Sequence, residues 1–363
     1  DRNRRPGADA VSIYWVKDTV AADTIGTVDT FADPYGIQKA FDLATAGDEI
    51  RIVVGANNYN SASTSWTNRD AADKTINVDS ATPGTATNYV KVSGWTDETT
   101  EGQVTLDFDS AVIVGSNGFT VTVSYYVWKN IHVTDCDIDG WDVSAIRHVF
   151  YMCKASANGV NGWDTSWGIV WTRCEAANNG GDGIEGSGVF AYCELHDNTA
   201  LGSGGGGDSN TIVSTIFDGN TGDGASVDDY NMLVGCLFED NNNGLSISSA
   251  NVGNSFVNCG FTNSAGYGVA NATGYLILEI NCGYYGNGTG TVQGTIAVQA
   301  NRVTTDPTFT DAANRDYSIG TNWKAQGEGG YPSGASTGYV DIGAVQRQET
   351  AAGGGGSCHV IGG

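Results

Sequence analysis

The sequence is poor in proline, methionine and positive charge. Its 363 residues include 5 prolines, 2 methionines and 17 lysines and arginines, against 41 aspartates and glutamates, so the net charge is −24. A nucleic acid or an anionic membrane surface would repel such a chain. No apolar run approaches the roughly 18 residues that span a bilayer. These shortages exclude nucleic-acid and membrane partners and leave neutral glycans, cations or other protein subunits.

Close cysteine pairs of the C-x2-C kind are absent as well, which argues against a zinc site. Seven cysteines instead recur at wide intervals, and the position missing from one doubled interval is Thr215. These cysteines are Cys136, Cys153, Cys174, Cys193, Cys236, Cys259 and Cys282. Side chains stacked in register point the same way, which suits disulfide geometry poorly. We therefore predict a column of buried, reduced thiols inside a repeat structure.

The rest of the repeat agrees with the cysteine spacing. An apolar column two residues after the cysteines comprises Leu195, Phe217, Phe238, Phe261 and Tyr284, and turns rich in Asn, Asp and Gly follow. Short alternating strands and left-handed corners at a fixed period indicate a solenoid. A leucine-rich repeat would need a leucine framework that this chain lacks. The prediction is an all-β, right-handed parallel β-helix with about 21 residues per coil.

The two ends are expected to cap this solenoid. Residues 33–47 predict a short amphipathic helix with Asp33 as N-cap and Gly47 at its end, and residues 48–55 predict the first core strand. Because the chain begins at Asp1 rather than at methionine, we expect that an initiator or a leader was removed. The organisation expected is an N-terminal segment, 1–57, coils over 58–300, a closing segment, 301–348, and a Gly-rich tail, 349–363.

The helix followed by Ala-Gly-Asp-Glu-Ile at 46–50 and an apolar strand resembles the start of pectate-lyase-like β-helix proteins. Residues 306–309, 316–320 and 338–346 resemble their closing segment, and this stretch with its Gly-rich tail is also similar to β-helical proteins of tailed phages. The resemblance implies the fold more than a function, because the superfamily contains lyases, hydrolases, adhesins and phage proteins.

Candidate catalytic residues are acidic. The lyases that the chain resembles use a Lys or Arg base, yet no Lys or Arg occurs between Arg173 and Arg302. A glycoside hydrolase would need paired carboxylates, and counting back from the cysteine column aligns Glu185, Asp208 and Asp229 on successive coils. The alternative is that these carboxylates only decorate a solvated face of an acidic protein.

Other residues suggest binding. Trp163 and Trp167 flank a turn and are expected to be exposed, where they could contact sugars or proteins. Asp135, Asp137 and Asp139 alternate as if on one strand face, so bound Ca²⁺ is an option, although no EF-hand-type loop is present. In the tail, Val360 and Ile361 could form a small apolar plug held by another subunit.

The function that we expect from the sequence is that of a non-catalytic protein on an extracellular or virion surface. Such a protein would be capsid-associated or fibre-like, assemble as a homo-oligomer or in a larger complex, and contact glycans. The alternative is a polysaccharide-degrading enzyme, a glycoside hydrolase rather than a lyase, that uses Asp208, Asp229 and Glu185.

Overall fold

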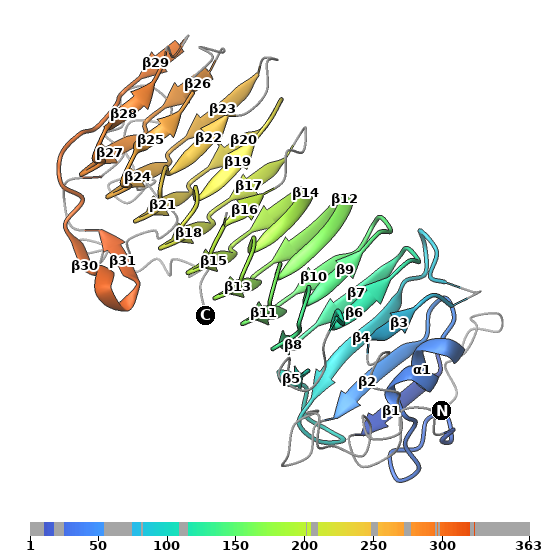
Figure 1. Ribbon diagram of the computed structural model, residues 1–363. Helices are drawn as coiled ribbons and strands as arrows, with labels where there is room; N and C mark the ends of the chain where they lie inside the picture. Colours follow the sequence, from blue (N-terminus) through green and yellow to red (C-terminus); the bar gives the residue numbers. More distant parts are fainter. Residues whose placement is uncertain are drawn as a thin grey trace, which may run out of the picture.

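The chain folds as a right-handed parallel β-helix with three faces (Figure 1). The computed structural model describes residues 11–17, 25–53, 75–80, 83–108, 115–200, 202–204, 210–247, 253–271, 277–294, 296, 298–319 and 323. We call these faces A, B and C, and each coil contributes one strand to each of them in the chain order C, A, B. Strands of neighbouring coils pair in parallel. The long strands β12 (Trp163–Thr172) and β14 (Ile184–Ala191) run across faces C and A without a break. The predicted fold is therefore confirmed.

Face A contains β1 (Ile13–Lys17), β2 (Glu49–Val53), β4 (Val90–Trp95), β7 (Tyr126–Lys129), β10 (Val149–Tyr151), the second halves of β12 (Trp163–Thr172) and β14 (Ile184–Ala191), β17 (Thr211–Val213), β20 (Met232–Val234), β23 (Asn254–Val257), β26 (Ile277–Ile280) and β29 (Val298–Ala300). Face B contains β5 (Val104–Asp107), β8 (Ile131–Thr134), β11 (Lys154–Ser156), β13 (Glu175–Ala177), β15 (Glu194–His196), β18 (Ile216–Asp218), β21 (Leu237–Glu239), β24 (Gly260–Thr262) and β27 (Gly283–Tyr285). Face C contains β3 (Ile76–Val78), β6 (Phe119–Val121), β9 (Trp141–Val143), the first halves of β12 and β14, β16 (Ser203–Gly204), β19 (Ala225–Val227), β22 (Leu245–Ile247), β25 (Tyr267–Ala270) and β28 (Gly290–Gln293).

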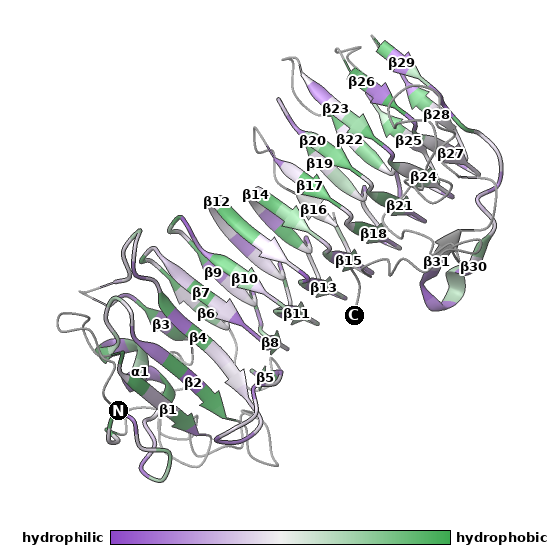
Figure 2. Cartoon of the chain, turned by 180° about the vertical axis from the view of Figure 1, so that it is seen from behind, coloured by the Kyte–Doolittle hydropathy of each residue, from purple (hydrophilic) through white to green (hydrophobic). Residues whose placement is uncertain are grey.

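Alternation within these short strands sends every second side chain into the bore. Hydrophobic positions recur from coil to coil (Figure 2). The apolar column predicted after the cysteines lies on face B. Its rings stack at centroid distances of 4.7 Å for Phe217 and Phe238, 4.9 Å for Phe238 and Phe261, and 5.0 Å for Phe261 and Tyr284. Stacking like side chains in this way fills the core without a change of shape between coils.

The thiol column is confirmed for six of its seven cysteines. From Cys153 to Cys282 they lie at the corner between faces A and B, buried and unpaired, and buried Thr215 fills the missing position. Cys136 is the exception, because it lies at the corner between faces B and C, where its N–H donates to Asn158 Oδ1 at 3.1 Å. It therefore belongs to a different column. Burial raises the pKa of the Cys153 thiol to about 12, so a reactive thiolate is disfavoured there.

That second column is a ladder of buried asparagines. Each side chain donates through Nδ2 to Oδ1 of the next, at distances between 2.8 and 3.0 Å. The members are Asn158, Asn179, Asn198, Asn220 and Asn241. The residue before each is at a left-handed corner, as at Asn178 (φ 57°) and Gly219 (φ 62°). The Asn-rich turns seen in the sequence are thus internal hydrogen-bonding positions as well as corners.

A glycine column follows the asparagine ladder and leads into face C. A Cβ on Gly162 would lie 2.5 Å from the carbonyl oxygen of Gly183, and one on Gly183 would lie 2.5 Å from that of Gly202. Glycine is required here because the backbones of consecutive coils approach too closely for any side chain. The step from this glycine into face C is the same in successive coils, since Trp163 and Ile184, each one residue after its glycine, are paired.

The N-terminal helix is shorter than predicted. Helix α1 (Ile37–Leu43) begins after Gly36, and no side chain caps it, so the expected role of Asp33 as N-cap is wrong. Asp33 instead accepts a hydrogen bond from the Thr27 hydroxyl. Phe41 packs against Phe119 and Trp128 at centroid distances of 5.9 and 5.8 Å. The helix therefore covers the apolar end of the bore, as expected of a cap. With seven residues it is too short to cross a bilayer.

The C-terminal segment turns back along face B (Figure 1). Strands β30 (Phe309–Asp311) and β31 (Asp316–Ile319) form an antiparallel pair around the 3₁₀ turn η1 (Ala312–Asn314). Trp323 covers Gly260 and Gly283, where an added Cβ would lie 2.5 and 2.8 Å from its ring. The described part of the closing segment thus lies on the flank of the solenoid. Residues 338–346 and the tail, with Val360 and Ile361, fall outside the described residues.

Candidate functional site

Three carboxylates form a row on face C, which we call the acidic row: Asp142, Asp164 and Glu185. The register pairs Asp142 with Asp164 and Asp164 with Glu185 on β9, β12 and β14. Neighbouring rungs of a parallel sheet lie about 4.8 Å apart. The outward column then continues with Ser226 and Ser246 on β19 and β22. The acidic row is therefore three coils long, and its members are one or two rungs apart.

Polar side chains from the neighbouring corner position these carboxylates. Asn117 Nδ2 donates to Asp142 Oδ2 at 3.0 Å, and Asn161 Nδ2 donates to Glu185 Oε2 at 3.0 Å. A fourth carboxylate, Asp139, lies at the same corner and accepts a hydrogen bond from the Asn161 N–H at 2.8 Å. Asp142 and Asp164 are half-buried, whereas Glu185 is exposed. These hydrogen bonds hold Asp142 and Glu185 in place, while Glu185 at one end of the row faces solvent.

Crowding makes these acids hold their protons more tightly than usual. Burial, opposed by the Asn161 N–H and reinforced by Asp164, Asp142 and Glu185, raises the pKa of Asp139 to about 6. Burial and the charge of Asp164 also raise the pKa values of Asp142 and Glu185. The pKa values of the row and of the adjoining Asp139 are thus all shifted upward, the direction that favours a carboxyl acting as a proton donor in glycosidic-bond chemistry.

These pKa shifts predict how stability depends on pH. Because the pKa of Asp139 rises from 3.8 to about 6 on folding, protonation of this carboxyl stabilises the folded state. That stabilisation is fully present below about pH 4 and is lost as the pH rises through about 6. We expect Asp139→Asn to flatten this decline and to melt at a higher temperature than the wild type at pH 7. Asp97→Asn is the control, since hydrogen bonds from Thr99 lower the pKa of Asp97. Identical melting profiles of Asp139→Asn and wild type across pH 4–7 would contradict the prediction.

The predicted ladder of Glu185, Asp208 and Asp229 is wrong as a stacked set. Glu185 stacks on Asp164, and the face C strand of the coil that holds Asp229 contributes Ser226 to the column. Asp229 lies beyond β19, at the corner toward face A, and is only 4% exposed. Asp208 falls outside the described residues. Of the three, only Glu185 is placed with other carboxylates.

The error came from the choice of reference point. Counting from the cysteine column crosses the corner between faces C and A, where β12 contains register shifts around Trp167. The glycine column is a better reference, because Gly140-Trp141-Asp142, Gly162-Trp163-Asp164 and Gly183-Ile184-Glu185 share one pattern. An acid two residues after each glycine was the signal that would have found the row.

The two predicted tryptophans differ. Trp163 is fully buried and stacks on Trp141 at 6.4 Å, so its predicted exposure is wrong. The reason is strand alternation, because Asp164 points outward from β12 and its neighbour must point inward. Trp167 is 66% exposed, as expected. It lies three residues after Asp164 in β12, between the two register shifts at the corner toward face A.

The predicted calcium ligands do not share a strand face. β8 ends at Thr134, and Asp135 adopts a left-handed conformation (φ 57°), so residues 135–139 form a corner in which alternation does not apply. Asp137 accepts a hydrogen bond from the Gly115 N–H at 2.5 Å. Across the described part of the chain, no group of three or more His, Cys, Asp or Glu side chains is arranged to hold a metal ion.

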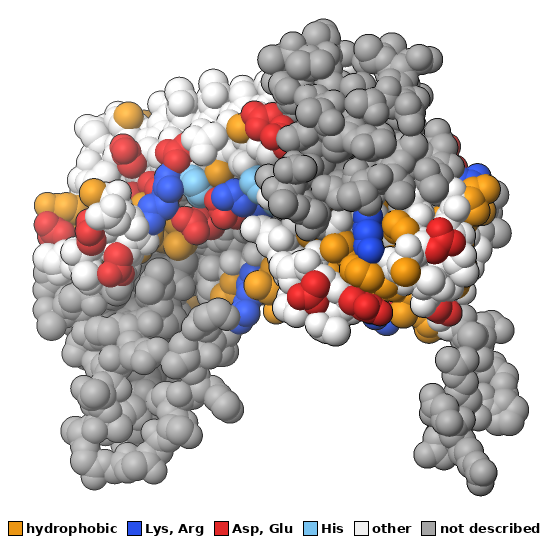
Figure 3. Space-filling view, turned by 90° about the horizontal axis from the view of Figure 1, so that it is seen from below, with side chains coloured by type: hydrophobic (Ala, Val, Ile, Leu, Met, Phe, Trp, Pro, Cys, Tyr) orange, Lys and Arg blue, Asp and Glu red, His pale blue; other side chains and the backbone are white. Residues whose placement is uncertain are grey.

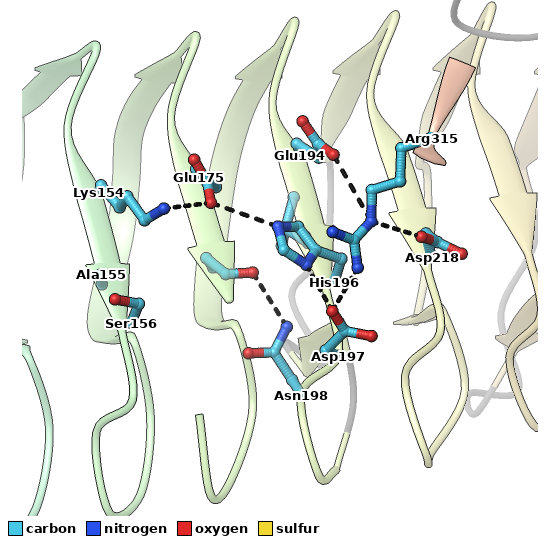
Figure 4. A network of polar contacts seen from close by, with 12 residues as sticks. Lys154, Ala155, Ser156, Glu175, Glu194, His196, Asp197, Asn198, Asp218 and Arg315 are labelled. Atoms are coloured by element: carbon cyan, nitrogen blue, oxygen red, sulfur yellow. Dashed lines mark hydrogen bonds and ion pairs between the residues drawn. The ribbon is translucent and has the colours of Figure 1, made fainter. Parts of the chain in front are cut away.

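Basic residues gather on face B among carboxylates (Figure 3). Lys154 Nζ lies 2.5 Å from Glu175 Oε1, which also lies 3.3 Å from His196 Nε2 (Figure 4). Hydrogen bonds from His196 and Lys154 lower the pKa of Glu175 to about 2. Burial alone would lower the pKa of His196, but its bonds to Glu175 and Asp197 outweigh burial and raise it. This chain of charges is internally paired.

Arg315 extends the same network and attaches the C-terminal hairpin to face B. It contacts Asp197, and its Nε donates to Asp218 Oδ2 at 2.8 Å. On an earlier coil Lys129 also has a carboxylate partner, because its Nζ lies 2.7 Å from Glu101 Oε2. None of these groups stands on face C, and among the described outward positions of that face no Lys or Arg lies beside the acidic row, unlike the cationic base that the resembled lyases use.

Comparison with known proteins identifies the fold. No protein-family model matches the chain, and no curated protein matches it in sequence. Pectate lyase Pel9A superposes with a TM-score of 0.57 at 15% identity, covering 94% of this chain and 98% of its own. The Azotobacter vinelandii mannuronan C-5 epimerase AlgE4 A-module covers 72% and 89% (TM-score 0.39, 12% identity), and Geobacillus virus E2 ORF18 covers 74% and 57% (TM-score 0.38, 12% identity). At this identity the likeness shows the fold alone: the chain is a right-handed parallel β-helix, the fold of pectate lyase Pel9A.

Proposed function

We propose that this protein binds a polysaccharide along face C as a surface protein of an extracellular or virion assembly. The observation that carries the proposal is the acidic row beside the exposed Trp167. Ordered carboxylates accept hydrogen bonds from sugar hydroxyls, and an exposed indole offers a flat apolar surface to a sugar ring. The row lies on the regular part of face C and Trp167 at its corner toward face A, both on paired strands, which limits the ordering cost of binding.

The charge of the row selects the kind of sugar. The outward positions of face C from β6 to β28, as far as the structure describes them, carry Asp142, Asp164 and Glu185 and no Lys or Arg. A uronate polymer would place like charges against the row, whereas a neutral or an amino sugar would not. The proposed ligand is therefore a neutral or amino-sugar polysaccharide.

Hydrolysis is a second candidate, favoured by the raised pKa values of the row. Carboxylates on neighbouring rungs are about 5 Å apart, close to the separation of the two catalytic carboxylates in a retaining glycosidase. Carboxylates two rungs apart approach the wider separation found in an inverting glycosidase. A carboxyl with a raised pKa could protonate the leaving oxygen while an ionised neighbour acts as nucleophile or base. Glycan binding without cleavage remains the leading proposal, in keeping with a structural role.

Binding to a neutral glucan, chitosan and polygalacturonate tests the proposal. We expect the first or second to bind and the third not to bind. Trp167→Ala should weaken binding about tenfold, because the loss of a ring contact costs about 1.5 kcal/mol. Tyr285→Ala, which removes an exposed ring from face B, is the matched control. Absence of binding to both neutral and amino sugars, or equal binding of the two variants, would overturn the proposal.

Release of reducing ends separates the two candidates. If the wild type cleaves a bound polysaccharide and Asp164→Asn binds it without cleaving, the protein is a hydrolase. If neither cleaves, the row is a binding surface only. Asp164 is the most informative position because it lies between the other two carboxylates and influences the pKa of both.

A further inference from the structure

Face A changes character along the solenoid. Its first strands expose charged side chains, including Glu49, Arg51, Lys91 and Lys129. From β10 to β29 two outward columns run over eight strands, and none of their sixteen residues is charged. The columns are Val149, Val170, Val189, Thr211, Met232, Ser255, Leu278 and Val298, and Tyr151, Thr172, Ala191, Val213, Val234, Val257, Ile280 and Ala300. We call this surface the apolar face.

No described segment buries the apolar face. Val298 is 56% exposed, Met232 45%, Val189 37% and Leu278 36%, and none of the sixteen residues is buried. Charged residues make up 16% of the chain, so sixteen positions at that average would carry about two or three charges. Their complete absence from a chain with 58 charged residues (41 + 17) marks the face as different from the rest of the surface.

We infer that the apolar face is the contact surface between copies of this chain. Two copies that each carry a net charge of −24 repel one another wherever their carboxylates face. The uncharged stretch from β10 to β29 is where they can meet without bringing like charges together. Its side chains are mainly aliphatic, which suits a protein partner better than a sugar, for which aromatic rings would be expected.

The size and shape of the face fit this role. Eight strands span about 38 Å along the axis, and five residues across, including the corners, span about 16 Å, which gives on the order of 600 Å² per copy. A standard interface uses about 800 Å² per partner. A two-fold axis through the face would place it against itself, so that one patch serves both copies. At the adjoining corner Met152 and Tyr192, 41% and 42% exposed, would add to the contact, and Arg173 between them is the charged residue at this edge of the face.

Sedimentation analysis of the full chain from about 1 to 100 µM tests the inference. We expect the wild type to self-associate, Met232→Glu combined with Leu278→Glu to remain monomeric, and Ser226→Glu on face C of the same region to associate like the wild type. Both variants should melt within a few degrees of the wild type. A monomeric wild type throughout, or a double variant that associates as well as the wild type, would overturn the inference.

The two methionines of the chain provide a test without mutation, should the double variant fail to fold. Met232 lies within the apolar face and Met152 at its edge. Peroxide should oxidise Met232 several-fold more slowly at high than at low protein concentration, with a smaller change at Met152. Equal oxidation rates at both concentrations would overturn the inference. The apolar face and the acidic row share no residue, so failure of self-association would leave the glycan proposal standing, and the reverse also holds.

Discussion

Asn198→Ala is expected to lower the free energy of unfolding by about 3–5 kcal/mol. Asn198 Oδ1 accepts hydrogen bonds from the N–H and the Nδ2 of Asn179 at 3.2 and 2.8 Å. Its Nδ2 donates to Asn220 Oδ1 at 3.0 Å and to the carbonyl oxygen of Ala176 at 3.2 Å. Alanine removes all four bonds at a site without solvent access, and each buried polar group left unpaired costs about 1–3 kcal/mol.

Urea unfolding followed by circular dichroism would measure this loss. Thr199→Ala is the matched control, because Thr199 is the exposed neighbour in the same turn and its bond to the preceding coil, from its N–H to the Asn179 carbonyl oxygen, is made by the backbone. We expect that control to cost at most about 0.5 kcal/mol. If Asn198→Ala were no more destabilising than Thr199→Ala, the asparagine ladder would be a consequence of the fold and not a source of its stability.

The coil order could be predicted from the sequence because each coil repeats the same inward positions. Phe217, Phe238 and Phe261 recur with their cysteines or Thr215, and the structure stacks them in register. The sequence did not show which asparagines form the buried ladder. A left-handed corner and a buried amide ladder both favour asparagine, and composition alone does not separate Asn178 at the corner from Asn179 in the ladder.

The acidic row was missed for a geometric reason. Glu185 was a candidate, but its partners Asp142 and Asp164 lie ten or eleven residues before a cysteine, whereas Glu185 lies eight before one. The corner between faces C and A varies in length, while the step from the glycine column to the acidic row is two residues in each of the three coils. Contacts between distant segments, such as Arg315 on Asp218, have no periodic signal in the sequence at all.

Arg302→Ala should also lower the free energy of unfolding by about 3–5 kcal/mol. The inward column of face A is apolar through Phe256 and then reaches Glu279, which is fully buried. Arg302 pairs with both oxygens of that carboxylate, at 2.9 and 2.6 Å, and Tyr284 donates its hydroxyl to it at 3.2 Å. Removing the guanidinium leaves a buried charge without its partner, which is among the most costly single changes to a core.

A double variant distinguishes this explanation from a loss of packing, since Arg302 also lies over the Tyr284 ring at 4.8 Å. Glu279→Leu combined with Arg302→Ala removes the stranded charge and extends the apolar column, so it should regain all but about 1–2 kcal/mol. Lys129→Ala, which breaks a more exposed pair with Glu101, should cost no more than about 1 kcal/mol. If the double variant stayed as unstable as Arg302→Ala, lost packing rather than an unpaired carboxylate would explain the effect. If it recovered, the Glu279–Arg302 pair would be a device that ends the apolar column at this end of the solenoid.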